Sequence, residues 1–296
     1  MGKRLLGAKP PVQYYVLIFG ALLALVFITP LILTVTNSFM SLGEIMSNYG
    51  MIIPDQDSNE MVNNGYANLK LVPDMVTIRQ YYQVLIKESQ YLFMFWNSVF
   101  LVAMILIGQI LVASTAAFAF AKIDFRWKEP LFLIYILVML MPFQVTLVPN
   151  YLVADFLGLI DKPGSIILPG IFSAFGVFLL RQFMSSIPDQ YIEAARIDGA
   201  GYFTIFYRII LPMSKNAIAA LAILVFMDNW NMVEQPLIFL QSVFKQPLSL
   251  FLSQVNLKEM GIAFAASTIY MIPALLVFFY AENYFVEGIQ HSGLKL

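Results

Sequence analysis

The sequence predicts an all-α polytopic membrane protein with six transmembrane helices. Of its 296 residues, 60% are hydrophobic and only 12% are charged, whereas soluble proteins have about 45–50% apolar and about 25% charged residues. The apolar residues gather into runs of about twenty, the length that an α-helix needs to cross the hydrocarbon core of a bilayer. The net charge of −1 does not indicate a nucleic-acid partner, and the absence of cysteine excludes disulfides and thiolate metal sites.

The first predicted transmembrane helix covers residues 14–36 and follows a short basic segment, residues 1–13. Because no small-residue cleavage pattern follows the apolar run, we expect an uncleaved helix rather than a signal peptide. Pro30 should kink its second half. A polar loop, residues 37–92, comes next, and within it the stretch Thr77–Tyr91 predicts a short amphipathic helix.

The remaining segment, residues 93–296, is predicted to be a core with five further spans. These lie at about 93–121, 131–153, 166–183, 217–239 and 265–285. The third should break near Met141–Pro142, and the fourth is interrupted by Pro169–Gly170. The second half of the second span favours close helix packing because it is rich in small residues, namely Gly108, Ala113, Ser114, Ala116, Ala117 and Ala119.

The distribution of basic residues predicts which ends of the spans face the cytoplasm. Six spans place both termini on one side, and Lys and Arg are enriched on the cytoplasmic side. With the termini inside, eleven of the seventeen basic residues share the inner face: Lys3, Arg4, Lys9, Lys122, Arg126, Lys128, Arg181, Arg196, Arg208, Lys215 and Lys295. We therefore expect cytoplasmic termini, an extracytoplasmic loop at 37–92, and a cytoplasmic segment at 184–215.

The cytoplasmic segment 184–215 predicts two short helices joined by a turn. Residues 190–197 are good helix formers, and Gly199 and Gly201 can end that helix. Residues 202–210 predict a second helix that Pro212 should stop. A compact helix pair at the membrane surface is suited to docking a partner.

The residues of this segment resemble the EAA loop of ABC-importer membrane subunits. The resemblance is carried by Glu193-Ala194-Ala195, Gly199, Ile209 and Leu211-Pro212 at their spacing. It extends over most of Thr77–Lys295, including Trp230-Asn231 and Pro236-Leu237, and is similar to the shorter permease of maltose-type carbohydrate importers. The resemblance implies a type I importer permease fold and a coupling loop formed by Glu193, Ala194, Ala195, Asp198, Gly199, Ile209, Leu211 and Pro212.

The resemblance also implies an assembly in the cell membrane of a prokaryote. Its members would be this chain, a second permease that forms a heterodimer with it, two ATP-binding subunits and an extracytoplasmic solute-binding protein. The chain has no phosphate-binding loop, so we expect a transport subunit without a cofactor, with ATP and Mg on the partner. We expect Glu193 and Asp198 to fix the helix pair by capping or pairing. Ala194, Ala195 and Gly199 would be small so that the helix fits the partner's cleft.

Four polar residues are candidates for the translocation path: Asn229, Asn231, Asp228 and Gln144. Neutral hydrogen-bonding groups suit a sugar better than an ion, so an oligosaccharide is expected, followed by a polyol or glycerol-phosphate-like solute. A non-carbohydrate ABC importer is an alternative. A gradient-driven carrier is another, but its relay would depend almost entirely on Asp228. Residues 46–71 are interpreted as a surface loop or a contact for the solute-binding protein.

Overall fold

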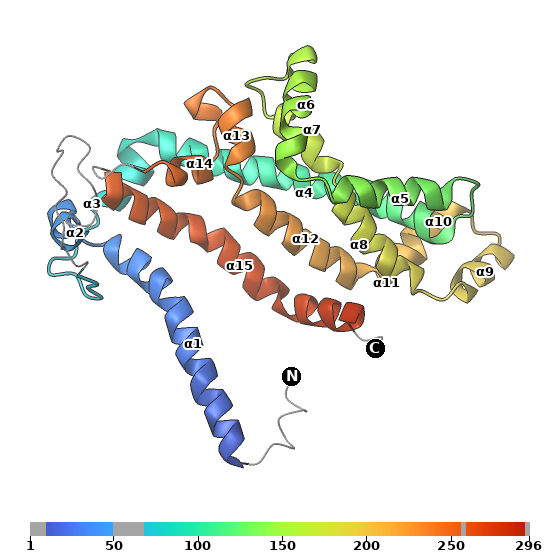
Figure 1. The fold of residues 1–296 in the computed structure, drawn as a ribbon, viewed down its shortest axis with the longest axis horizontal. Coiled ribbons are helices and arrows are strands. Elements are labelled where there is room, and N and C mark those ends of the chain that lie inside the picture. The colour runs from blue at the N-terminus through green and yellow to red at the C-terminus, as the bar shows by residue number, and fades with distance from the viewer. Residues whose placement is uncertain (1–9, 50–67, 256–258, 294–296) are drawn as a thin grey trace. The chain divides into compact units, whose positions relative to one another are not determined.

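The computed structural model describes residues 10–49, 68–255 and 259–293. All regular elements of these residues are helices (Figure 1). The chain divides into two compact units, one made of Met1–Tyr91 with Gln254–Tyr270 and the other of Leu92–Ser253 with Met271–Leu296. Two of the three boundaries fall within long helices, α4 (Ser89–Lys122) and α15 (Met260–Gly293), and the third lies between Ser253 and Gln254.

Within the described residues, four helical stretches are long and apolar enough to cross a membrane, and six if each of two bent pairs counts as one span. The four are Tyr14–Asn37, Ser89–Lys122, Gly164–Ser185 and Met260–Tyr280. The bent pairs are Lys128–Met139 with Phe143–Phe156, at 102°, and Tyr202–Met213 with Lys215–Trp230, at 74°. The predicted class, an all-helical membrane protein with several spans, is therefore confirmed.

The first unit is built from α1 (Pro10–Asn37), α2 (Leu42–Tyr49), α3 (Arg79–Tyr82), a π-helical turn (Gln83–Lys87) and the start of α15. Glu44 of α2 holds the chain after residue 67, because its carboxylate accepts a hydrogen bond from the backbone N–H of Asp74 at 2.8 Å. Lys70 pairs with Asp74 and Glu44. The hydrogen bond to Asp74 raises the pKa of Lys70.

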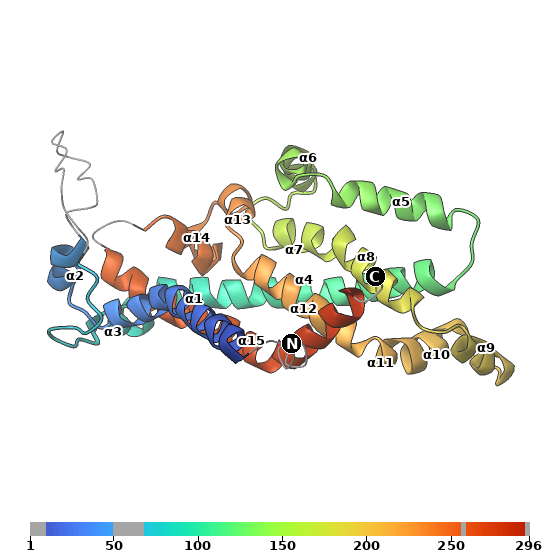
Figure 2. The same ribbon diagram turned by 60° about the horizontal axis from the view of Figure 1, so that its bottom comes forward.

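The second unit contains the other helices. Along the chain they are α4, α5 (Lys128–Met139), α6 (Phe143–Phe156), α7 (Gly164–Ile171), α8 (Ala174–Ser185), α9 (Gln190–Ile197), α10 (Tyr202–Ile205), a π-helical turn (Phe206–Ile210), α11 (Leu211–Met213), α12 (Lys215–Trp230), α13 (Glu234–Phe239), a 3₁₀ turn (Val243–Lys245), α14 (Leu248–Ser253) and the rest of α15. Figure 2 shows α13 and α14 near the start of α4, and α9 and α10 near its far end.

The third span breaks where predicted, whereas the fifth span has a break that was not predicted. The helix breaks between Met139 and Phe143, at Met141–Pro142. The predicted fifth span, 217–239, was wrong because α12 ends at Trp230 and a separate helix starts at Glu234. A continuous helix would place Pro236 in its interior, where the ring clashes with the preceding turn, whereas the first turn of a new helix accepts it.

The small residues of α4 allow close packing, as predicted. A Cβ on Gly108 would lie 2.5 Å from Ile171 Cγ1. A Cβ on Gly176 would lie 2.9 Å from Gln109 Nε2 and 3.2 Å from the Ala113 Cβ. Gly108 therefore lets α4 approach α7 closely, and Gly176 lets α8 approach α4. Of the predicted loop 46–71 and the basic N-terminal segment, residues 50–67 and 1–9 lie outside the described residues.

Candidate functional site

We call residues 184–215, for which coupling to an ATPase is predicted, the coupling segment. Its helix α9 ends in a glycine-dependent turn. As predicted, α9 covers Gln190–Ile197. Gly199 follows with φ +82°, its N–H donates to Arg196 O at 3.0 Å, and the Ala200 N–H donates to Ala195 O at 2.9 Å. This pair of bonds is a Schellman motif, in which the left-handed residue is usually glycine. The positive φ is thus a second reason for glycine at position 199, beside the small size expected from the sequence.

The second helix of the segment runs further than predicted. It starts at Tyr202 as α10, widens into the π-helical turn Phe206–Ile210, and continues as α11 through Pro212 to Met213. In the π turn, the Leu211 N–H donates to Phe206 O. The helix ends at Met213, one residue after Pro212, and α12 starts at Lys215 at an angle of 74°, so the predicted stop at Pro212 is confirmed to within one residue.

The coupling segment has one buried face and one bare face. The buried face belongs to the hydrophobic core of the unit and consists of Ile192, Ile205, Phe206 and Ile210, each at most 9% exposed. The bare face includes Ile197, Phe203 and Tyr207, which are 87%, 81% and 66% exposed. The segment is thus packed on one side and presents large apolar side chains on the other.

The motif residues fall on both faces. Glu193, Ala194, Asp198, Gly199 and Pro212 are exposed, whereas Ala195, Ile209 and Leu211 are half-buried. No hydrogen bond or ion pair to the side chain of Glu193 or Asp198 is found within the described ranges. A different pair of side chains interacts in this region. Arg196 donates to the hydroxyl of Tyr202 and stacks over its ring, with the guanidinium carbon 4.5 Å from the ring centroid.

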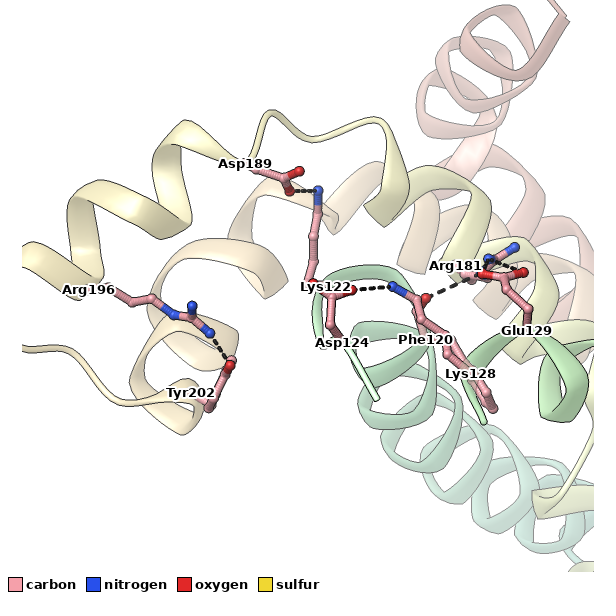
Figure 3. A network of polar contacts seen from close by, with 9 residues as sticks. All are labelled: Phe120, Lys122, Asp124, Lys128, Glu129, Arg181, Asp189, Arg196 and Tyr202. Carbon is pink, nitrogen blue, oxygen red and sulfur yellow. Dashed lines mark hydrogen bonds and ion pairs between the residues drawn. The ribbon is translucent and has the colours of Figure 1, made fainter. Parts of the chain in front are cut away.

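Two cationic side chains attach this segment and α8 to the end of α4 (Figure 3). Lys122 Nζ lies 2.6 Å from Oδ1 of Asp189, the residue that immediately precedes α9. Arg181 of α8 donates to Phe120 O at 3.4 Å and to Glu129 Oε1 at 3.2 Å. Its guanidinium carbon also lies 3.8 Å from the centroid of the Phe132 ring. In the sequence, both cations indicate only which side of the membrane they face.

At the opposite end of α4, Asp161 holds the segment that follows α13. Asp161 has φ +58°. Its Oδ1 accepts from the Ser242 N–H at 2.9 Å, and Oδ2 accepts from Ser242 Oγ and Lys245 Nζ, both at 2.6 Å. Hydrogen bonds from Lys245 and then from Ser242 hold the pKa of Asp161 well below its usual range. No role was predicted for Asp161 from the sequence, because its partners Ser242 and Lys245 lie 81 and 84 residues further along the chain.

The first residues of α4 hold the same segment through its backbone. Asn97 Nδ2 donates to Phe244 O at 2.6 Å and to Gln246 O at 3.2 Å. Ser98 Oγ accepts from the Leu248 N–H at 3.0 Å. We call residues 239–248 the pinned segment. No structural role was predicted for Asn97-Ser98 from the sequence.

The four path candidates lie near the end of α12 and the start of α6. Asp228 and Asn231 are exposed and Asn229 is half-buried. The Asn229 and Asn231 amides donate to Val225 O and Met227 O, their own helix. Gln144 Nε2 lies 3.3 Å from Glu234 Oε2, so α6 and α13 are joined by two exposed polar side chains.

Together, the spans and the half-bare coupling segment define a class of protein, the membrane-spanning subunit of a larger assembly. A family model described as the binding-protein-dependent transport system inner membrane component matches residues 93–291, and the chain belongs to this family. It is therefore a permease subunit of an ABC importer rather than an enzyme.

Two curated relatives agree. The arabinooligosaccharides transport system permease protein AraQ of Halalkalibacterium halodurans is 28% identical over 269 residues, covering 89% of this chain and 96% of the relative. The lactose transport system permease protein LacG of Rhizobium radiobacter is 32% identical over 201 residues, 67% of this chain and 74% of the relative.

A solved structure supports the fold. The crystal structure of a bacterial ABC transporter involved in the import of the acidic polysaccharide alginate aligns with a TM-score of 0.77 at 21% identity, covering 94% of this chain and 99% of that chain. At this identity the likeness is evidence of fold alone.

Proposed function

We propose that the bare face of the coupling segment is the docking surface of an ATP-hydrolysing subunit. The observation that carries the proposal is the exposure of Ile197, Phe203 and Tyr207 on a segment whose other face is packed. Lipid is a poor partner for this surface, since Glu193 and Arg208 are exposed on the same segment and charges are costly within a membrane. An exposed apolar surface rimmed by polar residues is typical of protein interfaces.

In this function, the motif residues have separate tasks. Gly199 allows the turn between the two helices, and Ala194 lets the exposed side of α9 lie close to the partner. The carboxylates of Glu193 and Asp198 have no partner in the described part of the chain, so we assign them to basic groups of the ATP-hydrolysing subunit. ATP and Mg are bound there and not by this chain.

We further propose that this chain forms half of a path for a sugar or oligosaccharide. AraQ and LacG are named for arabinooligosaccharide and lactose transport, and the path candidates of this chain are mostly neutral. Asp228 and Asn231 are exposed on the subunit by itself. A second permease facing them would close the path and complete a heterodimer, which works with two ATP-binding subunits and a solute-binding protein in a prokaryotic cell membrane. The termini and the coupling segment would face the cytoplasm.

The test is purification of the tagged chain from its own membranes in detergent, followed by an ATPase assay. We expect an ATPase subunit and a second permease to co-purify, and Phe203→Asp to remove the ATPase. Val243→Asp places the same charge on an exposed apolar residue of the pinned segment and should retain it. Recovery of the chain alone, with solute transport in liposomes without ATP, would contradict the proposal and favour a carrier that uses Asp228.

The solute class is tested with the same preparation. A co-purified binding protein whose unfolding temperature rises only when oligosaccharides are added would support the sugar assignment. A binding protein that responds only to another class of solute would show a non-carbohydrate importer.

A further inference from the structure

We propose that Lys122 is a positioning residue that makes the coupling segment and α4 move as one body. This inference rests on the proposed docking of an ATP-hydrolysing subunit. It starts from accessibility: Lys122 is the last residue of α4, and its side chain is only 3% exposed. Lysine is almost never fully buried unless it is paired, so the groups around its ammonium indicate its role.

Both partners of the Lys122 ammonium belong to the entrance of α9. Nζ donates to Ile187 O and to Asp189 Oδ1, which lie 65 and 67 residues further along the chain. The cation also stands at the C-terminus of α4, where the helix dipole favours a positive charge. Lys122 therefore connects the end of one helix directly to the beginning of another.

The hydrogen bonding of the Asp189 carboxylate indicates that this connection fixes the position of α9 relative to α4. Asp189 immediately precedes α9, where an aspartate side chain commonly caps the first backbone N–H groups. Here the side chain makes no such cap, and Oδ1 accepts from Lys122 instead. A carboxylate that could have stabilised α9 by itself is used to hold α9 against α4.

Apolar contacts on both sides of the pair complete the joint. Ile187 and Ile192 flank Asp189 in the chain, and each is 6% exposed. Phe118 of α4 packs against Phe206 of the coupling segment, with ring centroids 5.2 Å apart. Apolar packing resists separation of the two parts but is non-directional, whereas the ammonium with its two acceptors fixes their relative position.

This joint supplies the mechanical step between the partner and the membrane. When the ATP-hydrolysing subunits move the coupling segment, Lys122 passes the displacement to α4, which runs to Asn97 and the pinned segment. Without the cation, α9 can follow the partner while α4 does not. ATP hydrolysis would then continue without a proportionate movement of solute.

The test uses the complete complex in proteoliposomes and the variant Lys122→Met, which keeps an unbranched apolar chain and removes the charge. We expect the ATPase subunit to remain bound and hydrolysis to continue, while solute moved per ATP hydrolysed falls about ten-fold, within the usual range of coupling between two sites. Asp189→Ala should show the same defect, and Asp189→Asn, which keeps the Oδ1 acceptor, a smaller one.

The neighbouring pair Lys128–Asp124 provides the matched control. Both aspartates are largely exposed, but the Lys128–Asp124 atoms are 3.4 Å apart and the Lys128 side chain is 18% exposed, against 2.6 Å and 3% for Lys122–Asp189. Exposed pairs contribute little. Lys128→Met should therefore leave the transport ratio unchanged. A proportional loss of hydrolysis and uptake in Lys122→Met would overturn the proposal, because it would show a role in stability alone.

A second measurement needs no ATPase. The chain has no cysteine, so spin labels can be attached at Thr115→Cys on α4 and Ile197→Cys on α9, both exposed. We expect a narrow distance distribution that broadens in Lys122→Met, and an unchanged distribution would overturn the inference. If the unmodified chain binds no ATPase, the proposed function fails, whereas this distance measurement still reports on the joint.

Discussion

The two ends of α4 hold their neighbouring segments in different ways. Near Asn97, the pinned segment is held by hydrogen bonds to its backbone and by Asp161. At Lys122, about 38 Å away at 1.5 Å per residue, the coupling segment is held by one buried cation and an apolar face, and its other face is bare. The first end thus maintains a shape within the subunit, whereas the second leaves half of its surface bare, as the proposed docking of a partner requires.

The largest effect should come from the contact of α8 with α4, the helix that carries both ends. Gly176→Leu places a side chain where a Cβ already lies 3.2 Å from the Ala113 Cβ, and overpacking of this kind costs about 1–3 kcal/mol. We expect a lower unfolding temperature in detergent and a disturbance of both segments. Gly20→Leu, with nothing within 4 Å of its Cβ, should have little effect, and equal losses would contradict the packing argument.

The next effect should be confined to the coupling end. Gly199→Val forces a β-branched residue to φ +82°, at a cost of roughly 1–3 kcal/mol. We expect the ATPase to be lost from the purified complex while membrane insertion survives, as also for Gly199→Leu. Gly199→Asn should be milder, since asparagine tolerates this conformation. Gly201→Ala is the control, because φ there is −76° and its Cβ would meet open space.

Substitution of Asp161, at the opposite end of α4, should affect the pinned segment but not the binding of the ATPase. Asp161→Ala removes the acceptor for Ser242 and Lys245 and also disfavours the left-handed backbone. We expect amide hydrogen exchange in the pinned segment to accelerate about ten-fold as it opens locally. Asp161→Asn keeps the backbone preference and the Oδ1 acceptor, so it should exchange more slowly than the alanine variant. Loss of the ATPase from either variant would contradict the view that the two ends of α4 act separately.

A smaller effect is expected from one neutral donor. Asn97→Ala removes two hydrogen bonds to carbonyl groups that water can reach in part, so the loss should be about 1 kcal/mol. This loss of stability is measured by thermal unfolding, with size-exclusion chromatography as the readout of the folded fraction. A much larger loss would show that Asn97, rather than Asp161, dominates this end.

The smallest effect is that of pH on the pinned segment. The folded-state pKa of Asp161 is depressed, so its contribution is complete above the unfolded value of about 3.9 and is lost only as pH falls through the folded value. Exchange rates in the pinned segment, corrected for intrinsic chemistry, should therefore be constant from about pH 8 to about pH 5. A transition in that window would contradict the pairing with Lys245.

The sequence predicts the elements better than the joints between them. The limits of α9 and the break at Met141–Pro142 follow from local helix propensity and proline sterics. The end of α12 does not, because the choice between an internal Pro236 and a new helix depends on tertiary packing. Lys122 and Asp161 could be found only through partners 67 and 81 residues away, which no spacing rule connects.

The π-helical turn Phe206–Ile210 has a consequence for chain length. Its extra residue rotates every later side chain by about 100° relative to an uninterrupted α-helix. Beyond this turn, Leu211 is half-buried and Met213 is exposed. Deleting one residue here could restore α-helical hydrogen bonding yet turn Leu211 and Pro212 to another side. Evolution should thus tolerate substitutions between Gly199 and Pro212 more readily than insertions or deletions.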